Sequence, residues 1–473
     1  MLDKTEVRPV DSSLERRRLL CVLSEVIEKL SRLDKILKSQ KVFITAQGAD
    51  EGSASALDTL ITFLARHKGT FLESSDLVAA ALQGVPLNQA QEIGVLAAIE
   101  ILITGVRKVH ELLLLLPRET AKPQASFLLR DCFGREDLRA SIVLTNFLSA
   151  YEYRFEDILK KINVEQEERE HLKQGGNVLC QAFADRENPL AWAVLAHEYG
   201  HCLDEEHAIS QGIRPGDGLD SAVVAETVAD FVAAHVLGPA SLLPILFLEM
   251  MQPQLKRLER ISAGHPPTPL RVQLVRDYLR DLGVGTADFE LEFTAYEHDY
   301  ARKLQRMDDG GRSVEAAGQE ARSFLVPLAG PISSKVNSLG LRRFEEQNSI
   351  NAKGLRETLS RRQPISSRRL RPDNEIFGAL NSLTSGQTPP DRAYEALSGL
   401  DEVPVPSSEI LTAGWIYKLT SFEGKLVETF PGGGRQPNLA VYADYVDKVD
   451  DWLLKSLELA AVHAEVRRRL DVM

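Results

Sequence analysis

The chain carries the sequence His-Glu-Tyr-Gly-His at residues 197–201, directly after a run of apolar residues. Residues four apart on a helix have Cβ atoms about 5–6 Å apart, so His197 and His201 can direct their imidazoles at one ion. Asn188 is a favoured N-cap residue and Pro189 suits the first helical position, so a helix is predicted to begin there. Two histidines on a buried apolar helix need polar partners, and one zinc ion (Zn2+) would supply them.

A second predicted helix offers the third ligand of this ion. It is capped by Asp220 or Ser221, ends at Gly238, and carries Glu226 and Asp230 on one face, four residues apart. With Glu226 as a ligand, Asp230 can accept a hydrogen bond from the far nitrogen of a ligand histidine, which satisfies both carboxylates. The alternative interpretation of these two acids is a solvated polar stripe.

His207 is the other possible third ligand. It follows His197 by ten residues, which is the spacing of the third histidine in metzincin motifs. Those motifs have glycine at the position of Asp204, where the chain must turn sharply, and aspartate enters the left-handed region less readily. Outside such a site, His207 is expected at the surface or beside the ligands.

Charge and composition narrow the classes of function. The chain has 56 basic and 68 acidic residues, a net charge of −12 that opposes general binding to nucleic acid. Segment 342–371 differs, because nine basic and three acidic residues give it a net charge of +6. We expect either a solvated loop or a site for an acidic partner, nucleic acid included, there.

Length and patterning predict an α+β protein that is predominantly helical. Its 473 residues are enough for two or three units, which we place at 1–120, 121–285 and 286–473. Apolar residues recur at helical spacing in several segments: 14–38, 57–64, 89–103, 106–116 and 439–470. Short β-rich segments at Ser141–Phe147 and Asn177–Phe183 predict a small sheet. The apolar runs 101–116 and 241–251 fail as membrane spans because of charges or length.

Four scattered cysteines without a Cys-x-x-Cys pair favour buried thiols in a reducing compartment. The first residues carry charges where a signal peptide would carry its apolar run. We therefore expect a cytoplasmic protein with no membrane contact.

Three motifs together resemble a family of zinc peptidases. They are the 197–201 motif, Glu-Thr-Val-Ala-Asp at 226–230, and His-Pro-Pro-Thr-Pro-Leu-Arg at 265–271. The trio resembles soluble relatives of the HtpX-like and CaaX-prenyl-protease gluzincins, and 226–239 also looks like the matching helix of ImmA/IrrE-like peptidases. The resemblance covers about 110 residues, roughly Asn177–Leu282, and this chain lacks the membrane helices of HtpX-like enzymes.

The resemblance implies a zincin-type core with His197, His201 and Glu226 as zinc ligands and Glu198 as general base. His265 is the leading candidate to stabilise the oxyanion, ahead of Tyr199. The other interpretation of His265 is a loop histidine before a helix that starts near Pro269. Strand 177–183 is then either a sheet edge that pairs with extended substrate or an internal strand.

These observations predict a zinc-dependent peptidase that cleaves a cytoplasmic protein. We expect a polypeptide substrate, and we expect the helical regions on either side of the core to gate the activity or direct it to its target. A regulatory protein is a further expected partner. The rival hypothesis is a zinc-binding regulatory module without turnover, in which the site is structural. The intact Glu198 argues against the rival, because a structural site needs no base beside its ligands.

Overall fold

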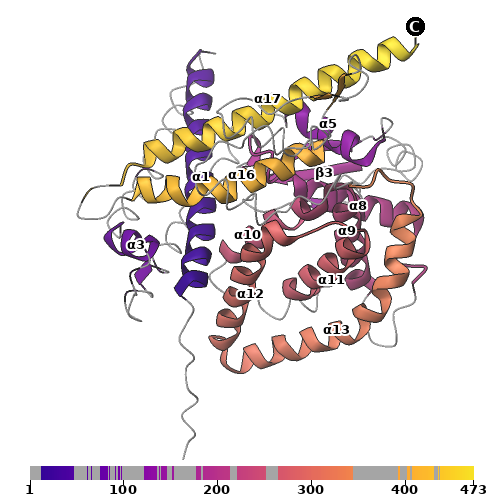
Figure 1. Ribbon diagram of the computed structural model, residues 1–473, viewed down its shortest axis with the longest axis horizontal. Coiled ribbons are helices and arrows are strands. Elements are labelled where there is room, and N and C mark those ends of the chain that lie inside the picture. Colours follow the sequence, from indigo (N-terminus) through magenta and orange to yellow (C-terminus); the bar gives the residue numbers. More distant parts are fainter. Residues whose placement is uncertain are drawn as a thin grey trace, which may run out of the picture.

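The computed structural model describes a part of the chain. It describes residues 12–46, 122–135, 140–145, 177–182, 185–213, 221–251, 265–344, 407–430 and 437–472, with short stretches or single residues within 61–97, at 138, 152–153, 392–394, 402–404 and 435. This part is predominantly helical, as predicted (Figure 1).

Two buried helices form the centre of the molecule. Helix α8 (Ala193–His207) packs along helix α9 (Ser221–Leu237), which is apolar on nearly all sides and buried over most of its length. Helix α9 ends at Gly238, whose φ of 60° lies in the left-handed region that ends helices. Segment Ser221–Ser241 is long and apolar enough to cross a membrane. However, 83% of its 18-residue apolar window is buried inside the protein, as in a core helix.

A short sheet precedes α8. Strand β3 (Asn177–Ala182) pairs in parallel with β1 (Ala140–Thr145) and antiparallel with β2 (Glu152–Tyr153), so the strand order is β1-β3-β2. Strand β3 is therefore the middle strand among the described residues. The prediction of an open substrate-binding edge at 177–183 is wrong where β2 covers β3, and the internal-strand alternative holds there.

Between α9 and residue 344, the described residues form four helices and two short 3-10 helices. In Figure 1, α13 runs along the lower edge, and α11 lies inside the frame that α12 and α13 make. The bounds of these elements are η3 Gly238–Ser241, α10 Leu243–Met251, α11 Thr268–Asp281, η5 Ala287–Phe289, α12 Glu290–Gln305 and α13 Asp308–Asn337.

The two ends of the chain pack together around this centre. Helix α1 (Ser12–Ala46) contacts α10 and α12 as well as α16 (Ser407–Thr429) and α17 (Leu439–Val472). Figure 1 shows α1 standing across α16 and α17. The remaining described elements are α3 Ser75–Leu82, α5 Pro123–Phe133, β4 Arg392–Tyr394 and β5 Glu402–Pro404.

Buried ion pairs fix α1 in this position. The Arg32 guanidinium contacts Asp450 of α17 at 2.7 Å, and Lys418 of α16 contacts Glu28 at 2.8 Å. Lys29 donates to both carboxylate oxygens of Asp185, at 2.9 Å each, in the connection between β3 and α8. Because each of these charges would be costly to bury alone, the pairs specify one arrangement of α1.

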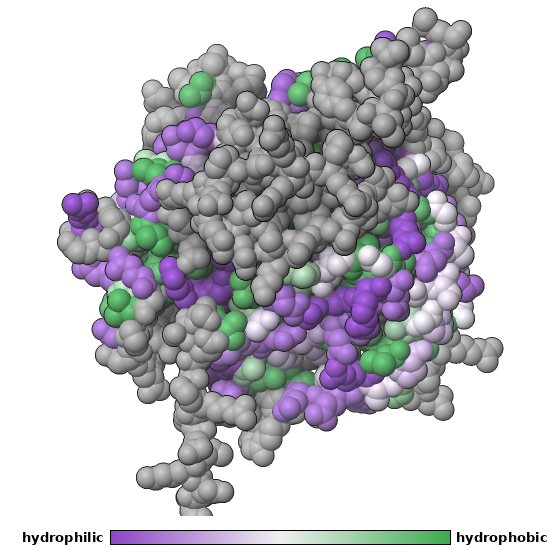
Figure 2. Space-filling model, in the orientation of Figure 1, coloured by the Kyte–Doolittle hydropathy of each residue, from purple (hydrophilic) through white to green (hydrophobic). Residues whose placement is uncertain are grey.

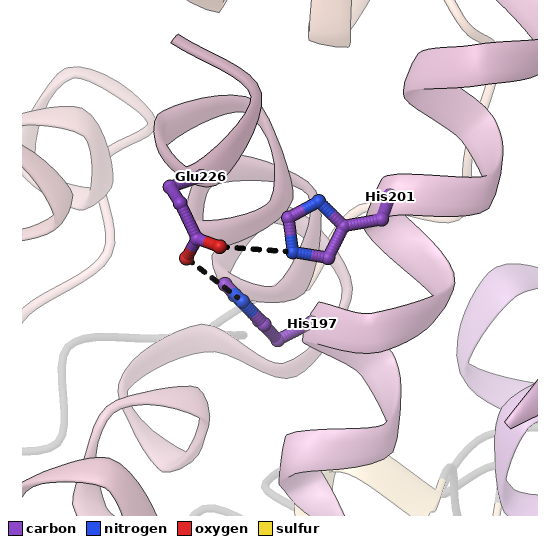
Figure 3. Close-up of side chains that lie close together, drawn as sticks. All are labelled: His197, His201 and Glu226. Carbon is purple, nitrogen blue, oxygen red and sulfur yellow. Dashed lines mark ion pairs between the residues drawn. The ribbon is translucent and has the colours of Figure 1, made fainter. Parts of the chain in front are cut away.

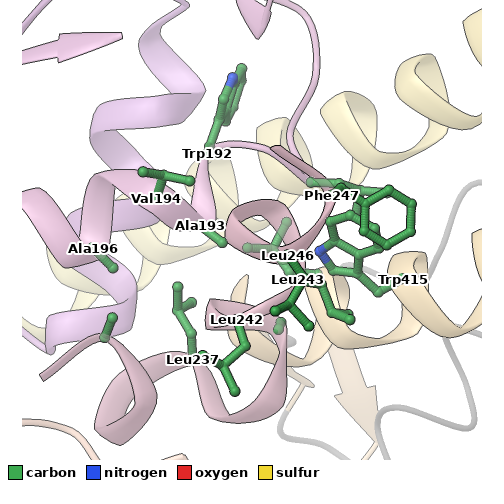
Figure 4. Packing of buried hydrophobic residues seen from close by; sticks show 14 of the residues in the cluster. Trp192, Ala193, Val194, Ala196, Leu237, Leu242, Leu243, Leu246, Phe247 and Trp415 are labelled. Atoms are coloured by element: carbon green, nitrogen blue, oxygen red, sulfur yellow. The ribbon is translucent and has the colours of Figure 1, made fainter. Parts of the chain in front are cut away.

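One apolar cluster joins these elements. Figure 4 shows Trp192, before α8, in the same buried cluster as leucines at the end of α9 and in α10, with Phe247 packed against Trp415 of α16. The rings of Phe247 and Trp415 lie 5.3 Å apart between centroids. Residues from all three predicted units therefore share one cluster, while their division at 120 and 285 stays a prediction.

Several helix predictions are confirmed, and one boundary is wrong. Helices α1 and α17 cover the predicted segments 14–38 and 439–470. Helix α8 begins at Ala193 and not after Asn188, because Asn188 donates its amide to the Asp185 carboxylate at 3.2 Å within a series of turns. The predicted helices at 57–64, 89–103 and 106–116 lie mostly outside the described residues.

Candidate metal centre

Helices α8 and α9 bring three potential ligands together. Glu226 Oε2 lies 3.4 Å from His197 Nε2, and Glu226 Oε1 lies 3.4 Å from His201 Nε2 (Figure 3). One ligand atom from each residue lies within 4.8 Å of the others. The two imidazole planes are nearly perpendicular, at 88°, so the rings approach the carboxylate from different directions. The group could hold a metal ion, as the sequence pattern predicted.

The group is buried at one end and accessible at the other. The side chains of His197 and Glu226 are 6% and 10% exposed, whereas that of His201 is 21% exposed. Burial alone would lower the pKa of His197, but the nearby Asp230 and Glu226 carboxylates raise it to about 10. Burial alone would raise the pKa of Glu226, but His197, His201 and Arg271 hold it well below its usual value. The centre therefore favours a cation beside its carboxylates.

Asp230 contacts His197 on the side of the ring that faces away from Glu226. Its Oδ1 lies 3.0 Å from His197 Nδ1, the ring nitrogen that faces away from Glu226. Arg271 of α11 donates to Asp230 through Nε at 2.7 Å and through a terminal nitrogen at 2.6 Å. This two-point contact holds the carboxylate in place, and its charge keeps the pKa of Asp230 near 2 against the effect of burial.

Gly200 sets how closely the two ligand-bearing helices approach. A Cβ atom at this position would lie 2.7 Å from the Cα of Ala229 and 3.0 Å from its carbonyl oxygen. Real side chains do not make such contacts with backbone, so α9 could not lie this close to α8 with any other residue here. The sequence pattern marks position 200 only as one of the two variable residues of the motif, so reasoning from the sequence missed this role.

Glu198 and Tyr199 lie on the same turn of α8 but in different surroundings. Glu198 is buried, at 8% exposure, beside His197. The ring of Tyr199 meets the edge of Phe133 of α5 at a centroid distance of 4.8 Å and is buried in the apolar cluster. Tyr199 is thus a residue of the apolar core.

His265 lies at the accessible side of the group. Its Nε2 is 3.1 Å from Glu226 Oε1, while 57% of its side chain is exposed. The helix that follows begins at Thr268 with Pro269 in its first turn, close to the predicted start. Arg271 of this helix contacts Asp230 and lies 3.7 Å from Glu226.

The structure does not bring His207 to this group. Helix α8 continues without interruption to His207, so ten residues of helix separate it from His197 by about 15 Å along the axis. Its side chain is 43% exposed, with Glu206 as the nearest charge. Asp204, which stands at the metzincin glycine position, is buried and accepts hydrogen bonds from the backbone and hydroxyl of Ser210, both at 2.7 Å. The helix thus ends after His207, whereas the metzincin geometry needs the chain to turn at position 204.

The residues present fit a zinc ion. Glu226 Oε2 is buried and makes no hydrogen bond within the described part of the chain, although two imidazole nitrogens and Arg271 surround this carboxylate. Two neutral imidazoles and one carboxylate are a ligand set of catalytic zinc sites, which keep a further position for solvent. A buried charged oxygen without a hydrogen bond is costly, and a metal ion would remove that cost.

Comparison of the chain with protein-family models, curated proteins and solved structures finds no match. The resemblance to gluzincins therefore depends on the sequence motifs alone.

Proposed function

We propose that the protein is a zinc-dependent metallopeptidase of the gluzincin type with a zincin-like core. The observation that carries this proposal is the position of Glu226, whose two oxygens face the Nε2 atoms of His197 and His201 from a separate helix. These three residues would hold one zinc ion. Zinc bound there supplies a Lewis acid, which acidifies water and polarises the carbonyl of a peptide.

Glu198 is the proposed general base. It follows His197 in the sequence and is buried, and a carboxylate beside bound zinc can take a proton from water and pass it to the leaving amine. His265 is the proposed oxyanion partner, because it lies at the accessible side of Glu226, where a substrate carbonyl would approach. Asp230 and Arg271 orient His197 and do not touch the substrate.

The substrate and its location follow from the same proposal. We infer a polypeptide substrate in the cytoplasm, with the helical regions on either side of the core gating or targeting the activity. A regulatory protein partner fits this construction. In the basic segment 342–371, Arg342 pairs with Asp131 at 2.9 Å and Arg343 donates to the Leu282 carbonyl. These two arginines therefore make contacts within the protein. The segment beyond residue 344 lies outside the described residues.

The test compares Glu198→Gln with wild type and with Glu205→Gln, a matched change at an exposed position of the same helix. Zinc content is measured by mass spectrometry, and cleavage is measured on a library of quenched fluorescent peptides. We expect one zinc ion per chain in all three proteins and loss of cleavage only in Glu198→Gln. Full cleavage by Glu198→Gln would refute the proposed base.

A zinc-binding regulatory module without turnover is the second candidate. It is favoured by the 3.1 Å distance between His265 and Glu226, because a fourth protein ligand would close the coordination sphere as in structural zinc sites. His265→Ala separates the two. Loss of zinc from this variant supports the closed site, whereas retained zinc with slower cleavage supports the peptidase.

A further inference from the structure

A cavity lies on the opposite side of α11 from the metal centre. It has a volume of about 730 Å³ and is lined by residues of α11, α12 and α13 and of the segments that connect them. This volume is in the range of cavities that bind small ligands, about 300–1,000 Å³. On the face drawn in Figure 2, hydrophilic side chains mix with hydrophobic ones over these helices.

Helix α11 separates the cavity from the metal centre. Arg271 points toward α9, where it contacts Asp230, whereas Gln273, Arg276 and Arg280 line the cavity. These positions lie on opposite faces of one helix. The cavity is thus a site of its own, and a ligand in it would not compete for the metal ligands.

Most charges around the cavity are already paired. Arg276 contacts Glu290 at 2.7 Å and Glu297 at 3.9 Å, and Arg280 contacts Asp277 at 2.7 Å. Two charges of the α13 wall are different. Within the described part of the chain, Glu315 makes no ion pair.

Arg322 is the second of these charges. It donates to the amide oxygen of Gln273 and meets no carboxylate among the described residues. Glu315 and Arg322 are seven residues apart, which places them on one face of α13 and about 10 Å apart along its axis. The wall therefore presents an anion and a cation, each without a charged partner, at opposite ends.

We propose that this cavity binds a short peptide of about three residues with free termini. The amino group would pair with Glu315 and the terminal carboxylate with Arg322. Three extended residues span about 10 Å, which matches the separation of positions 315 and 322 along the α13 axis. Leu270, Tyr300 and Val314 also line the cavity and offer apolar surface for the side chains of the peptide. This inference goes beyond the proposed peptidase activity and does not depend on bound metal.

The test is calorimetric titration of the full-length protein with the tripeptide Ala-Leu-Ala and with its N-acetylated and C-amidated forms. The variants are Glu315→Gln and Arg322→Gln, with Glu320→Gln and Lys335→Gln as matched changes at exposed positions of α13 outside the cavity. We expect each cap to weaken binding to wild type about three- to tenfold, as loss of one charged contact does.

The decisive result is whether each modified peptide terminus loses its effect in the variant that lacks the matching charge. Acetylation should have little further effect on Glu315→Gln, and amidation little further effect on Arg322→Gln, while the two control variants behave as wild type. Absence of binding at millimolar peptide, or binding that neither cap weakens, would overturn the proposal. Failure here would leave the peptidase proposal untouched, because the titration measures no cleavage.

Discussion

Gly200 of α8 lies against Ala229 of α9 so closely that an added Cβ would be 2.7 Å from the Ala229 Cα. Gly200 lies between His197 and His201 on α8, and Ala229 lies one helical turn after Glu226 on α9. This contact determines the separation of the two helices at the level of the metal centre. A change at Gly200 therefore acts on the ligands without altering any of them.

We expect Gly200→Ala to destabilise the protein by about 1–3 kcal/mol, because the new methyl group must push α9 away. The same displacement moves Glu226 from the histidines, so zinc affinity should fall as well. Urea unfolding and a competition assay with a zinc indicator measure the two effects. The control is Gly318→Ala in α13, where a Cβ would make an ordinary contact of 3.4 Å with Pro267. Equal effects of both changes would contradict the role of Gly200.

A second prediction concerns Arg271 and Asp230. Removing one partner of a buried ion pair leaves the other uncompensated, so Arg271→Ala and Asp230→Ala should each cost about 3–5 kcal/mol of stability. Arg271→Lys should recover only part of this loss, because lysine cannot make the two parallel contacts seen here. A double-mutant cycle in thermal unfolding gives the coupling between the two residues. Additive losses would show that they do not act as a pair.

A third prediction concerns zinc and stability. An ion that binds only the folded state stabilises it by about 2.7 kcal/mol when its free concentration is 100 times the dissociation constant. Chelation should therefore lower the melting temperature of wild type, and added zinc should restore it. We expect no such shift in His201→Ala or Glu226→Ala and a full shift in His207→Ala. A lost shift in His207→Ala, with Glu226→Ala unaffected, would reverse the ligand assignment.

A fourth prediction concerns acid. Burial alone would raise the pKa of Glu25, but Lys418 and Lys29 lower it from 4.5 to about 2. The folded state thus holds this carboxylate charged at pH values where the unfolded chain would protonate it. The stabilisation is present above pH 4.5 and is lost as the pH falls toward 2.

Urea unfolding at pH 7 and at pH 3 measures this effect. Glu25→Gln should be less stable than wild type at pH 7, by on the order of 2 kcal/mol, and the difference should shrink at pH 3. Glu458→Gln is the control, because Glu458 pairs with Lys455 at the surface, where both side chains are about half exposed. A difference that stays constant with pH would contradict the assignment.

Local patterns in the sequence were enough for helices α1 and α17 and for two of the three candidate ligands. The periodic apolar residues of α1 and α17 predicted helices because a helix must bury one continuous stripe. His197 and His201 were predictable together, since four residues of helix fix their spacing. The sequence offered both Glu226 and His207 as the third ligand. It could not decide between them, because the choice depends on which of them the fold brings to the two histidines.

The start of α8 shows why other local predictions failed. Asn188 has the chemistry of an N-cap, yet it bonds to Asp185, which Lys29 of α1 also holds. Lys29 is more than 150 residues away in the sequence. No local rule contains that contact.

The sequence by itself determined which residue types could bind a metal ion and on which helices they lie, because helical periodicity is a local property. Only the tertiary structure decided that Glu226 faces the histidines, that Arg271 holds Asp230, and that position 200 must be glycine. Each of these depends on how closely two helices pack, and that distance is fixed by contacts between residues far apart in the chain.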